Sequence, residues 1–299
     1  MTSGGIYRSE RGEERIKGLY DRMVSSLDTD VDRRWVETRF GETHLLVTGD
    51  ERSPPLVVFH GGNSVNPLTL EWFLPLADDF RIYAPDTIGH PGYSTQTRLS
   101  PRDRSYGKWV DDVLDGLGID AAPMVGVSYG AGIVLRTAAH SPERITCAGL
   151  LNPSGLGTGS IRRMLFEILV PLALYRAFSK ESHLESVLQS IYSEPVSGLD
   201  ETHVDLLRAV FEDVKLERNL PKTASSSELA EYDAPTLVSV SEHDVFFPPD
   251  VVVPRARSVI KHLDVVVRLQ GESHVPSRDA RDELLEHVSE FLLANCRRS

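Results

Sequence analysis

Residues 124–140, MVGVSYGAGIVLRTAAH, join an apolar run to a helix-forming run through the pattern Gly-x-Ser-x-Gly. Gly126 and Gly130 flank Ser128, and a turn this tight leaves no room for side chains at either glycine. Such a strand-to-helix turn exposes a serine hydroxyl, and the helix that follows favours developing negative charge. A glycine-rich packing or phosphate-binding turn is the alternative, but the glycine spacing does not match the dinucleotide pattern. We therefore predict Ser128 as a nucleophile.

An exposed serine is a weak nucleophile until a base accepts its proton and an acid orients that base. In folds with this turn, the three groups follow the chain order serine, acid, histidine. Asp244 lies in the loop that leaves the apolar run 236–240, and sites gather at such carboxyl ends of strands in open α/β sheets. We predict Asp244 as the acid, with Glu242, two residues nearer the strand, as the alternative.

The base must be a histidine beyond Asp244, and the sequence offers three. His274 follows the apolar run 265–269, in a loop at the carboxyl end of a strand, and is therefore expected level with the serine. His262 precedes that strand, and His287 lies in a C-terminal helical pattern. We predict His274 as the base.

Two preorganised backbone N–H groups stabilise the negative charge that develops on a substrate carbonyl oxygen. One donor is expected from Tyr129, the residue after the serine, and the other from the loop after the third strand. That loop is residues 60–64, HGGNS. Gly62 is our first choice for the second donor and Asn63 our second choice. His60 is expected to hold the loop rather than to act as a base.

Short apolar runs alternate with helix-like windows along most of the chain, which predicts an α/β protein with a mostly parallel sheet covered on both faces. The first two strands, 35–40 and 43–48, form a predicted hairpin with a turn at Gly41-Glu42, so the sheet is expected to be mixed. The other expected strands are 56–60, 81–85, 124–127, 145–151, 236–240 and 265–269, and the expected helices are 9–27, 68–78, 104–117, 129–140 and 278–294.

The alternation stops between Leu151 and Thr236, where the sequence shows only helical stretches, at 161–178, 181–192 and 201–214. We predict an inserted helical cap or lid at 156–229. The core is then residues 35–155 and 230–299, preceded by an N-terminal helical segment at 1–34. The alternative is that the inserted helices only pack against the core and take no part in binding.

The composition is that of an ordinary globular protein, with 40% hydrophobic and 25% charged residues. A net charge of −12 disfavours nucleic acid and anionic membrane as partners, because both attract a basic surface. Two cysteines exclude a disulfide framework, and the N-terminus lacks a signal-peptide pattern. The most apolar stretch, 168–175, is too short to span a bilayer. We expect a cytoplasmic protein without a membrane span. The oligomeric state stays open, and a homodimer through the cap or an edge strand is compatible with the sequence.

Five segments together resemble the α/β-hydrolase family: HGG at 60–62, PDTIGHPGYS at 85–94, GVSYGAG at 126–132, SEHDVFFP at 241–248 and GESHVP at 271–276. They occur in the family's order, cover most of the chain, and are most similar to bacterial carboxylesterase-like members. The resemblance implies an eight-stranded sheet, an inserted cap and serine esterase chemistry. It also implies roles for five residues: nucleophile Ser128, acid Asp244, base His274, and oxyanion donors Gly62 and Tyr129. Ser273 and the G-H-P-G turn depart from the commoner family pattern but remove no catalytic group.

Several activities agree with these residues. We favour a serine hydrolase that cleaves carboxylic esters through an acyl-enzyme, acting on a small molecule with an apolar acyl or alcohol group. A C–C or amide-bond hydrolase, or a haloperoxidase-like member, uses the same triad, and a non-catalytic small-molecule sensor uses the same scaffold. Ser128 argues against dehalogenase and epoxide hydrolase chemistry, which needs an aspartate nucleophile. No histidine pair has zinc spacing, so we expect neither a metal nor a cofactor.

Overall fold

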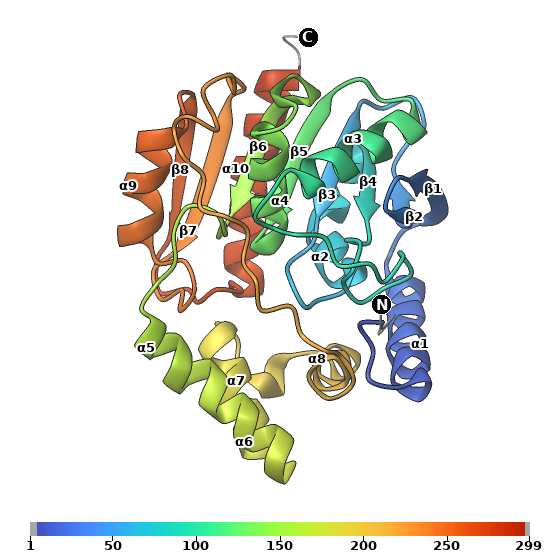
Figure 1. Ribbon diagram of the computed structural model, residues 1–299, viewed down its shortest axis with the longest axis vertical. Helices are drawn as coiled ribbons and strands as arrows, with labels where there is room; N and C mark the ends of the chain where they lie inside the picture. Colours follow the sequence, from blue (N-terminus) through green and yellow to red (C-terminus); the bar gives the residue numbers. More distant parts are fainter. Residues whose placement is uncertain (1–4, 297–299) are drawn as a thin grey trace.

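The computed structural model describes residues 5–296 and shows an eight-stranded sheet with helices on both faces (Figure 1). The strands are β1 Asp32–Thr38, β2 Gly41–Thr48, β3 Pro55–Phe59, β4 Arg81–Pro85, β5 Ala122–Val127, β6 Ile145–Leu151, β7 Thr236–Ser241 and β8 Leu263–Leu269. Their order in the sheet is β1-β2-β4-β3-β5-β6-β7-β8. Pairs β1–β2 and β2–β4 are antiparallel and the others are parallel, so the predicted mixed, mostly parallel sheet is confirmed.

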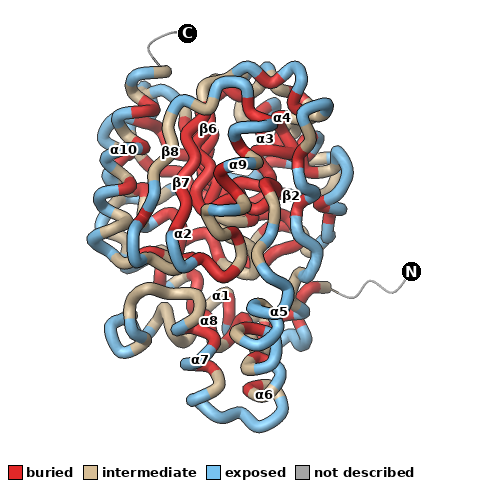
Figure 2. The backbone as a smooth tube through the Cα atoms, turned by 90° about the vertical axis from the view of Figure 1, so that its left-hand side faces the viewer, coloured by how far each residue is buried: buried red, intermediate tan, exposed pale blue. Residues whose placement is uncertain are grey.

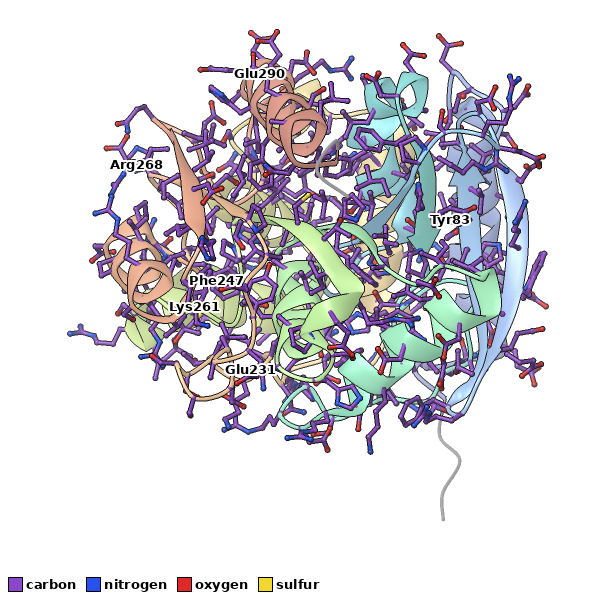
Figure 3. All side chains as sticks on the ribbon, turned by 90° about the horizontal axis from the view of Figure 1, so that it is seen from above. Tyr83, Glu231, Phe247, Lys261, Arg268 and Glu290 are labelled. Atoms are coloured by element: carbon purple, nitrogen blue, oxygen red, sulfur yellow. The ribbon has the colours of Figure 1, made fainter. Side chains whose placement is uncertain are left out.

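The core lies in two layers, one on each face of the sheet. Alternate strand residues point to opposite faces, so Val58 of β3 belongs to one buried cluster and Val57 to the other. The helices of the core are α1 Glu10–Ser26, α2 Asn66–Phe73, α3 Ser105–Leu117, α4 Tyr129–Ala138, α9 Pro249–Val259 and α10 Arg278–Cys296. Helices α1, α2 and α10 cover the Val58 face, and α3, α4 and α9 cover the Val57 face. Seen from above, Glu290 lies at the outside while Phe247 is enclosed (Figure 3).

The predicted hairpin exists, but its turn lies two residues earlier than expected. The turn is Arg39-Phe40, and Gly41 is the first residue of β2, paired with Thr38. Gly41 has a φ of 114°, a value that suits glycine, and its carbonyl accepts a hydrogen bond from Thr38 Oγ1 at 2.5 Å. As a result β1 begins at Asp32 and ends at Thr38, whereas the sequence predicts residues 35–40.

Prolines divide two of the predicted helices. The window 68–78 becomes α2 followed by the 3₁₀ turn Leu74–Asp78, which contains Pro75. The stretch 161–178 becomes α5 Ile161–Met164, a π turn at Leu165–Leu169 and α6 Val170–Phe178. Pro171 lacks the N–H that an α-helix needs at this position, which accounts for the wider turn.

Residues 156–229, called the insertion, connect β6 to β7 and contain α5, α6, α7 Glu181–Ile191 and α8 Glu201–Asp213. These helices lie beyond one end of the sheet (Figure 1) and are more exposed than the strands (Figure 2). A row of large apolar side chains between α5 and the end of α6 is exposed, namely Ile161, Leu165, Phe166, Leu169, Val170 and Phe178. No helix within residues 5–296 combines the length and the apolar run that crossing a membrane requires.

A buried carboxylate, Asp86, ties the N-terminal helix to the sheet. It accepts hydrogen bonds from Tyr20 Oη and Tyr93 N, both at 2.7 Å, and its Oδ2 lies 3.0 Å from His44 Nδ1. Burial opposes ionisation of Asp86, but the bonds from His44, Tyr93 and Tyr20 outweigh it and hold the pKa of Asp86 below its usual value. This network fixes α1 against the loop that follows β4, and that loop reaches the candidate site.

Candidate active site

Ser128 occupies the sharp turn between β5 and α4. Its backbone has a φ of 55° and a ψ of −112°, which side-chain-bearing residues seldom adopt. The neighbouring chain holds this conformation: the Ser128 N–H donates to Leu151 O at 2.8 Å, and the Ser128 carbonyl accepts from Ser154 N and Oγ, both at 3.1 Å. The hydroxyl is thus presented from a rigid support at the carboxyl end of a central strand.

The two glycines of the elbow are required by close contacts. A Cβ on Gly126 would lie 2.4 Å from Ala131 N, and one on Gly130 would lie 2.3 Å from Phe59 O. Both distances are far below van der Waals contact with backbone atoms, which cannot move without deforming the turn. The sequence argument for glycine at these positions therefore has a direct structural cause.

Adding a side chain at a glycine of the elbow should destabilise the protein because of this crowding. We expect Gly126→Ala to lower the free energy of unfolding by roughly 1–3 kcal/mol through overpacking. Gly18 in α1 is the matched control, because a Cβ there meets nothing within 4 Å. Gly18→Ala should raise the stability by about 0.5–1 kcal/mol, since glycine is costly inside a helix. Urea unfolding of both variants checks this, and equal midpoints would contradict the argument.

The structure brings together the three side chains that the sequence singled out. His274 Nε2 lies 3.0 Å from Ser128 Oγ, and His274 Nδ1 lies 2.8 Å from Asp244 Oδ2. Asp244 is fully buried, and its other oxygen accepts the N–H groups of Phe246 and Phe247 at 2.7 and 3.0 Å. These bonds fix the carboxylate, which in turn orients the imidazole toward the hydroxyl. The arrangement can transfer a proton from Ser128 to His274.

Two further groups hold His274 in position. The rings of Phe246 and Phe247 meet the imidazole edge-on, with ring centroids 4.9 and 5.6 Å away. Asn152 Nδ2 donates to the His274 carbonyl at 2.7 Å and to Ser241 Oγ at 3.0 Å. Sequence reasoning missed Asn152, although its position directly after the expected strand 145–151 was an available signal.

The competing residues lie elsewhere. Glu242 is exposed and accepts the Gly271 N–H at 2.8 Å. His262 is exposed, with Nε2 3.2 Å from Asp233 Oδ1, and His287 is exposed on α10. Neither histidine forms a hydrogen bond with Ser128, so geometry separates them from His274.

The loop after β3 runs beside the elbow. A Cβ on Gly61 would lie 3.8 Å from Ser128 Cβ, and one on Gly62 would lie 3.0 Å from Tyr129 Cβ. Within residues 5–296 the N–H groups of Gly62 and Tyr129 have no acceptor, whereas the Asn63 N–H donates to His90 Nδ1 at 3.3 Å. Of the two predicted candidates, Gly62 therefore has the available donor.

Buried histidines shape this loop. His60 Nε2 accepts the Thr87 N–H at 2.9 Å, and Nδ1 therefore carries the proton and donates to Gly61 O at 2.8 Å. Burial lowers the pKa of His60. Burial also lowers the pKa of His90, together with the repulsion that a protonated His60 would exert and the charge of Arg98. Both rings are consequently neutral near pH 7. Sequence reasoning missed His90, which accepts the Asn63 N–H and whose ring packs against Tyr129, with the ring centroids 4.8 Å apart.

The insertion is hydrogen-bonded to both loops of the site. Asn63 Oδ1 accepts the Glu217 N–H at 2.6 Å, and Asn63 Nδ2 donates to Glu217 O at 2.9 Å. At the histidine loop, Val275 N donates to Ile191 O at 2.8 Å. A small apolar cluster also joins the insertion to the loop of Asp244: Ile168, Leu172, Val187 and Val245, with Phe246 packed against it.

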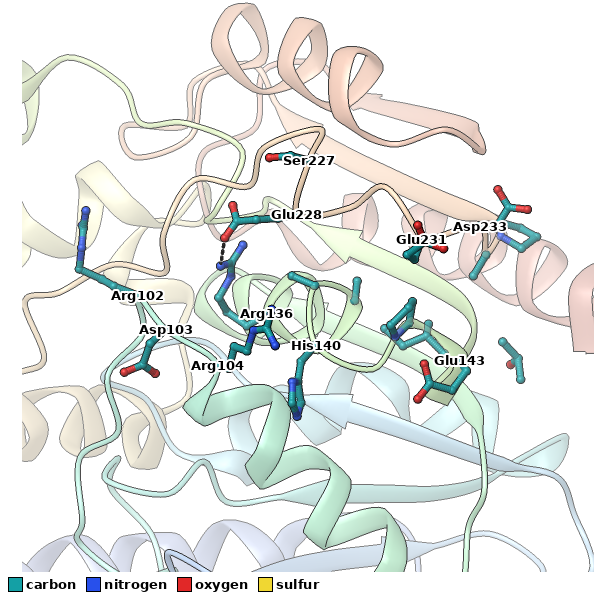
Figure 4. Close-up of a pocket in the computed structure, with 17 residues that line it drawn as sticks. Arg102, Asp103, Arg104, Arg136, His140, Glu143, Ser227, Glu228, Glu231 and Asp233 are labelled. Carbon is teal, nitrogen blue, oxygen red and sulfur yellow. Dashed lines mark hydrogen bonds and ion pairs between the residues drawn. The ribbon is translucent and has the colours of Figure 1, made fainter.

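A cavity of about 940 Å³ lies away from these residues, at the opposite end of α4 (Figure 4). Charged groups of both signs line it, including Arg136 and Glu228, which form a 3.0 Å ion pair. It adjoins Ile145 and Pro235 at the amino ends of β6 and β7. No member of the Ser128 arrangement lines it, and ligands of open α/β sheets bind at the carboxyl ends of strands.

Comparison with known proteins shows similarity to proteins with the α/β-hydrolase fold. A family profile described as the alpha/beta hydrolase fold matches residues 54–179. An uncharacterized carboxylesterase, nap, of Bacillus subtilis is 26% identical over 94% of this chain and 93% of its own. The crystal structure of naproxen esterase (carboxylesterase NP) from Bacillus subtilis has a TM-score of 0.80 at 24% identity, covering 95% of this chain and 99% of that one. A 2-hydroxymuconate semialdehyde hydrolase of a Pseudomonas species is 37% identical over 34% of this chain and 37% of its own.

Proposed function

We propose that this chain is a carboxylesterase-like α/β-hydrolase, and that it cleaves carboxylic esters through an acyl-enzyme formed on Ser128. The observation that carries the proposal is the unbroken hydrogen-bonded series from Ser128 Oγ through His274 to the buried Asp244, at 3.0 and 2.8 Å. A serine so placed has a base within reach and a support for that base.

In the first half of the reaction, Ser128 Oγ attacks the ester carbonyl carbon while its proton passes to His274 Nε2. Asp244 keeps the proton of Nδ1 in place and stabilises the imidazolium that forms. The carbonyl oxygen becomes negative and accepts hydrogen bonds from the Gly62 and Tyr129 N–H groups. Each such donor contributes about 2.7–4 kcal/mol of transition-state stabilisation.

The tetrahedral intermediate collapses when the bond to the alcohol oxygen breaks and His274 gives its proton to that oxygen. The alcohol leaves, and the acyl group stays on Ser128. Water then attacks the acyl carbon, with His274 accepting its proton, and a second collapse returns the proton to Ser128 Oγ and releases the acid. Apart from the substrate and water, every group in this cycle belongs to the chain.

The insertion, in this proposal, acts as a cap over the site. The bonds of Glu217 to the oxyanion loop and of Ile191 to the histidine loop support the cap interpretation. Helices that only packed against the core would not need such bonds. The apolar cluster of Ile168, Leu172 and Val187 next to Val245 favours a substrate with an apolar acyl or alcohol group. We expect the reaction to take place in the cytoplasm.

A C–C bond hydrolase is the second candidate, because the similarity to a 2-hydroxymuconate semialdehyde hydrolase reaches 37% where it applies. That match covers 34% of this chain, whereas the carboxylesterase match covers 94%. The ester activity is therefore the stronger proposal.

Turnover of a substrate panel tests this ranking. We expect the protein to hydrolyse p-nitrophenyl esters of short and medium acids, and to cleave the matching anilides and vinylogous diketones far more slowly, since esters have the better leaving group. A fluorophosphonate probe should label Ser128, as peptide mass spectrometry would show. Diketone cleavage without ester turnover would reverse the order, and a folded protein that is not labelled would favour a non-catalytic sensor.

A further inference from the structure

A second cavity, of about 380 Å³, is formed where the N-terminal segment, the loop after β4, α6 and the chain after α8 meet. Its charged lining consists of Arg8, Arg98, Arg176, Lys215, Glu217 and Arg218. Five cations thus face one carboxylate in a protein whose net charge is −12. We call this cavity the basic pocket.

The cations of the basic pocket are almost without counter-charges. Of the five cations, only Arg98 has a carboxylate of residues 5–296 within 4.0 Å: its Nε lies 3.7 Å from Glu217 Oε2. Glu212 and Asp213, which shortly precede Lys215 in the chain, are turned toward Arg15 instead, at 2.6 and 3.1 Å. The pocket therefore concentrates positive charge that the protein itself does not neutralise.

Neutral carbonyl groups hold these side chains in place. Arg8 Nε donates to Val214 O at 3.3 Å, and Arg176 Nε and Nη2 donate to Phe211 O at 3.0 and 2.9 Å. The end of α8 attracts cations through its dipole, which is a structural role for these arginines. These bonds use only part of each guanidinium, however, because neither Nη group of Arg8 nor Nη1 of Arg176 has an acceptor among residues 5–296. Burial, with the charges of Arg8 and Arg218, lowers the pKa of Arg176, as mutual repulsion requires.

We propose that the basic pocket binds a phosphate group, either free or at the end of a small organic molecule. Guanidinium groups that converge from separate chain segments can bind the several oxygens and the double charge of a phosphate. A carboxylate ligand has fewer oxygens and a smaller charge, and therefore suits such a group of cations less well. The volume of the cavity leaves room for more than the phosphate itself.

This site is separate from the Ser128 arrangement and does not rest on the proposed ester hydrolysis. None of Ser128, Asp244 and His274 lines the basic pocket. The two places are linked through Glu217, whose backbone is bonded to the Asn63 side chain, and through the charge of Arg98, which lowers the pKa of His90. Binding can therefore be measured whether or not the chain hydrolyses esters.

Calorimetric titration at low salt, with orthophosphate, pyrophosphate and glycerol 3-phosphate as ligands, tests the proposal. Arg218→Glu is the main variant, because the Arg218 side chain makes no hydrogen bond within residues 5–296 and its loss should not disturb the fold. Arg102→Glu is the matched control, with the same change of charge at an exposed arginine outside the pocket.

We expect the wild type to bind at least one ligand with a Kd below about 1 mM, and Arg218→Glu to weaken that binding roughly 10-fold or more. Arg102→Glu should bind like the wild type. Preference for orthophosphate or pyrophosphate identifies the free anion as the ligand, and preference for glycerol 3-phosphate identifies an organic phosphate. Absence of binding for all three ligands, or equal weakening in both variants, would overturn the proposal. Thermal unfolding confirms that each variant is folded, and Arg218→Gln replaces the glutamate variant if it is not.

Discussion

Ser128→Ala is expected to lower kcat for p-nitrophenyl ester hydrolysis on the order of 10⁶-fold, as loss of the nucleophile does in other serine triads. The reason is that the substitution removes the Oγ that lies 3.0 Å from His274 Nε2, so no acyl-enzyme can form. The fold should be unaffected, because the backbone strain at residue 128 is held by Leu151 and Ser154 through main-chain atoms that alanine retains. Steady-state kinetics and urea unfolding measure the two effects separately.

The double variant Ser128→Ala, His274→Ala makes this prediction more specific. If both groups serve one proton transfer, the double variant should be no slower than either single variant, because the effects of residues that act as a unit are not additive. Ser226→Ala is the control, since this exposed serine only bonds Ser258 O. Wild-type rates in Ser128→Ala would show that another group is the nucleophile. Multiplied losses in the double variant would show that Ser128 and His274 act independently.

The positions of the candidate site residues were predictable because each lies shortly after the carboxyl end of a strand. Ser128 follows β5, Asp244 follows β7 and His274 follows β8, and the carboxyl ends of neighbouring parallel strands meet at one edge of the sheet. The apolar runs that define these strands are strong sequence signals. For that reason the sequence predicts a common location for three residues that are far apart in the chain.

Residues that act through the backbone were not predictable in the same way. Asn152 supports the His274 carbonyl and His90 accepts the Asn63 N–H, and both contacts depend on how loops from different strands approach each other. The position of Asn152 directly after β6 places it at this edge of the sheet, but no further pattern separates such a polar residue from a solvated one. The same holds for the contact between Asn63 and Glu217, which joins segments 154 residues apart. Turn positions were also missed, as at Gly41, because pairing with Thr38 decided them.

The second large effect is expected for Asp244→Asn, with a fall in kcat of roughly 10⁴-fold and little change in KM. Two backbone N–H groups, of Phe246 and Phe247, point at Oδ1 of Asp244, so the asparagine must keep its oxygen there. Its amide NH₂ then faces His274 Nδ1, which becomes an acceptor and loses its proton. The imidazole proton moves to Nε2, and a protonated Nε2 cannot accept the proton of Ser128.

Glu242→Gln is the matched control, because Glu242 was the alternative acid and the substitution makes the same chemical change two residues away. Its carboxylate is exposed and accepts only the Gly271 N–H, a bond that glutamine can keep. We therefore expect wild-type kcat for Glu242→Gln and unchanged urea midpoints for both variants. A loss of activity in Glu242→Gln, with Asp244→Asn active, would reverse the assignment of the acid. Loss in Asp244→Asn alone, in a folded protein, would show that the carboxylate acts by fixing the tautomer of His274, since the asparagine keeps the shape and the Oδ1 bonds but cannot accept the Nδ1 proton.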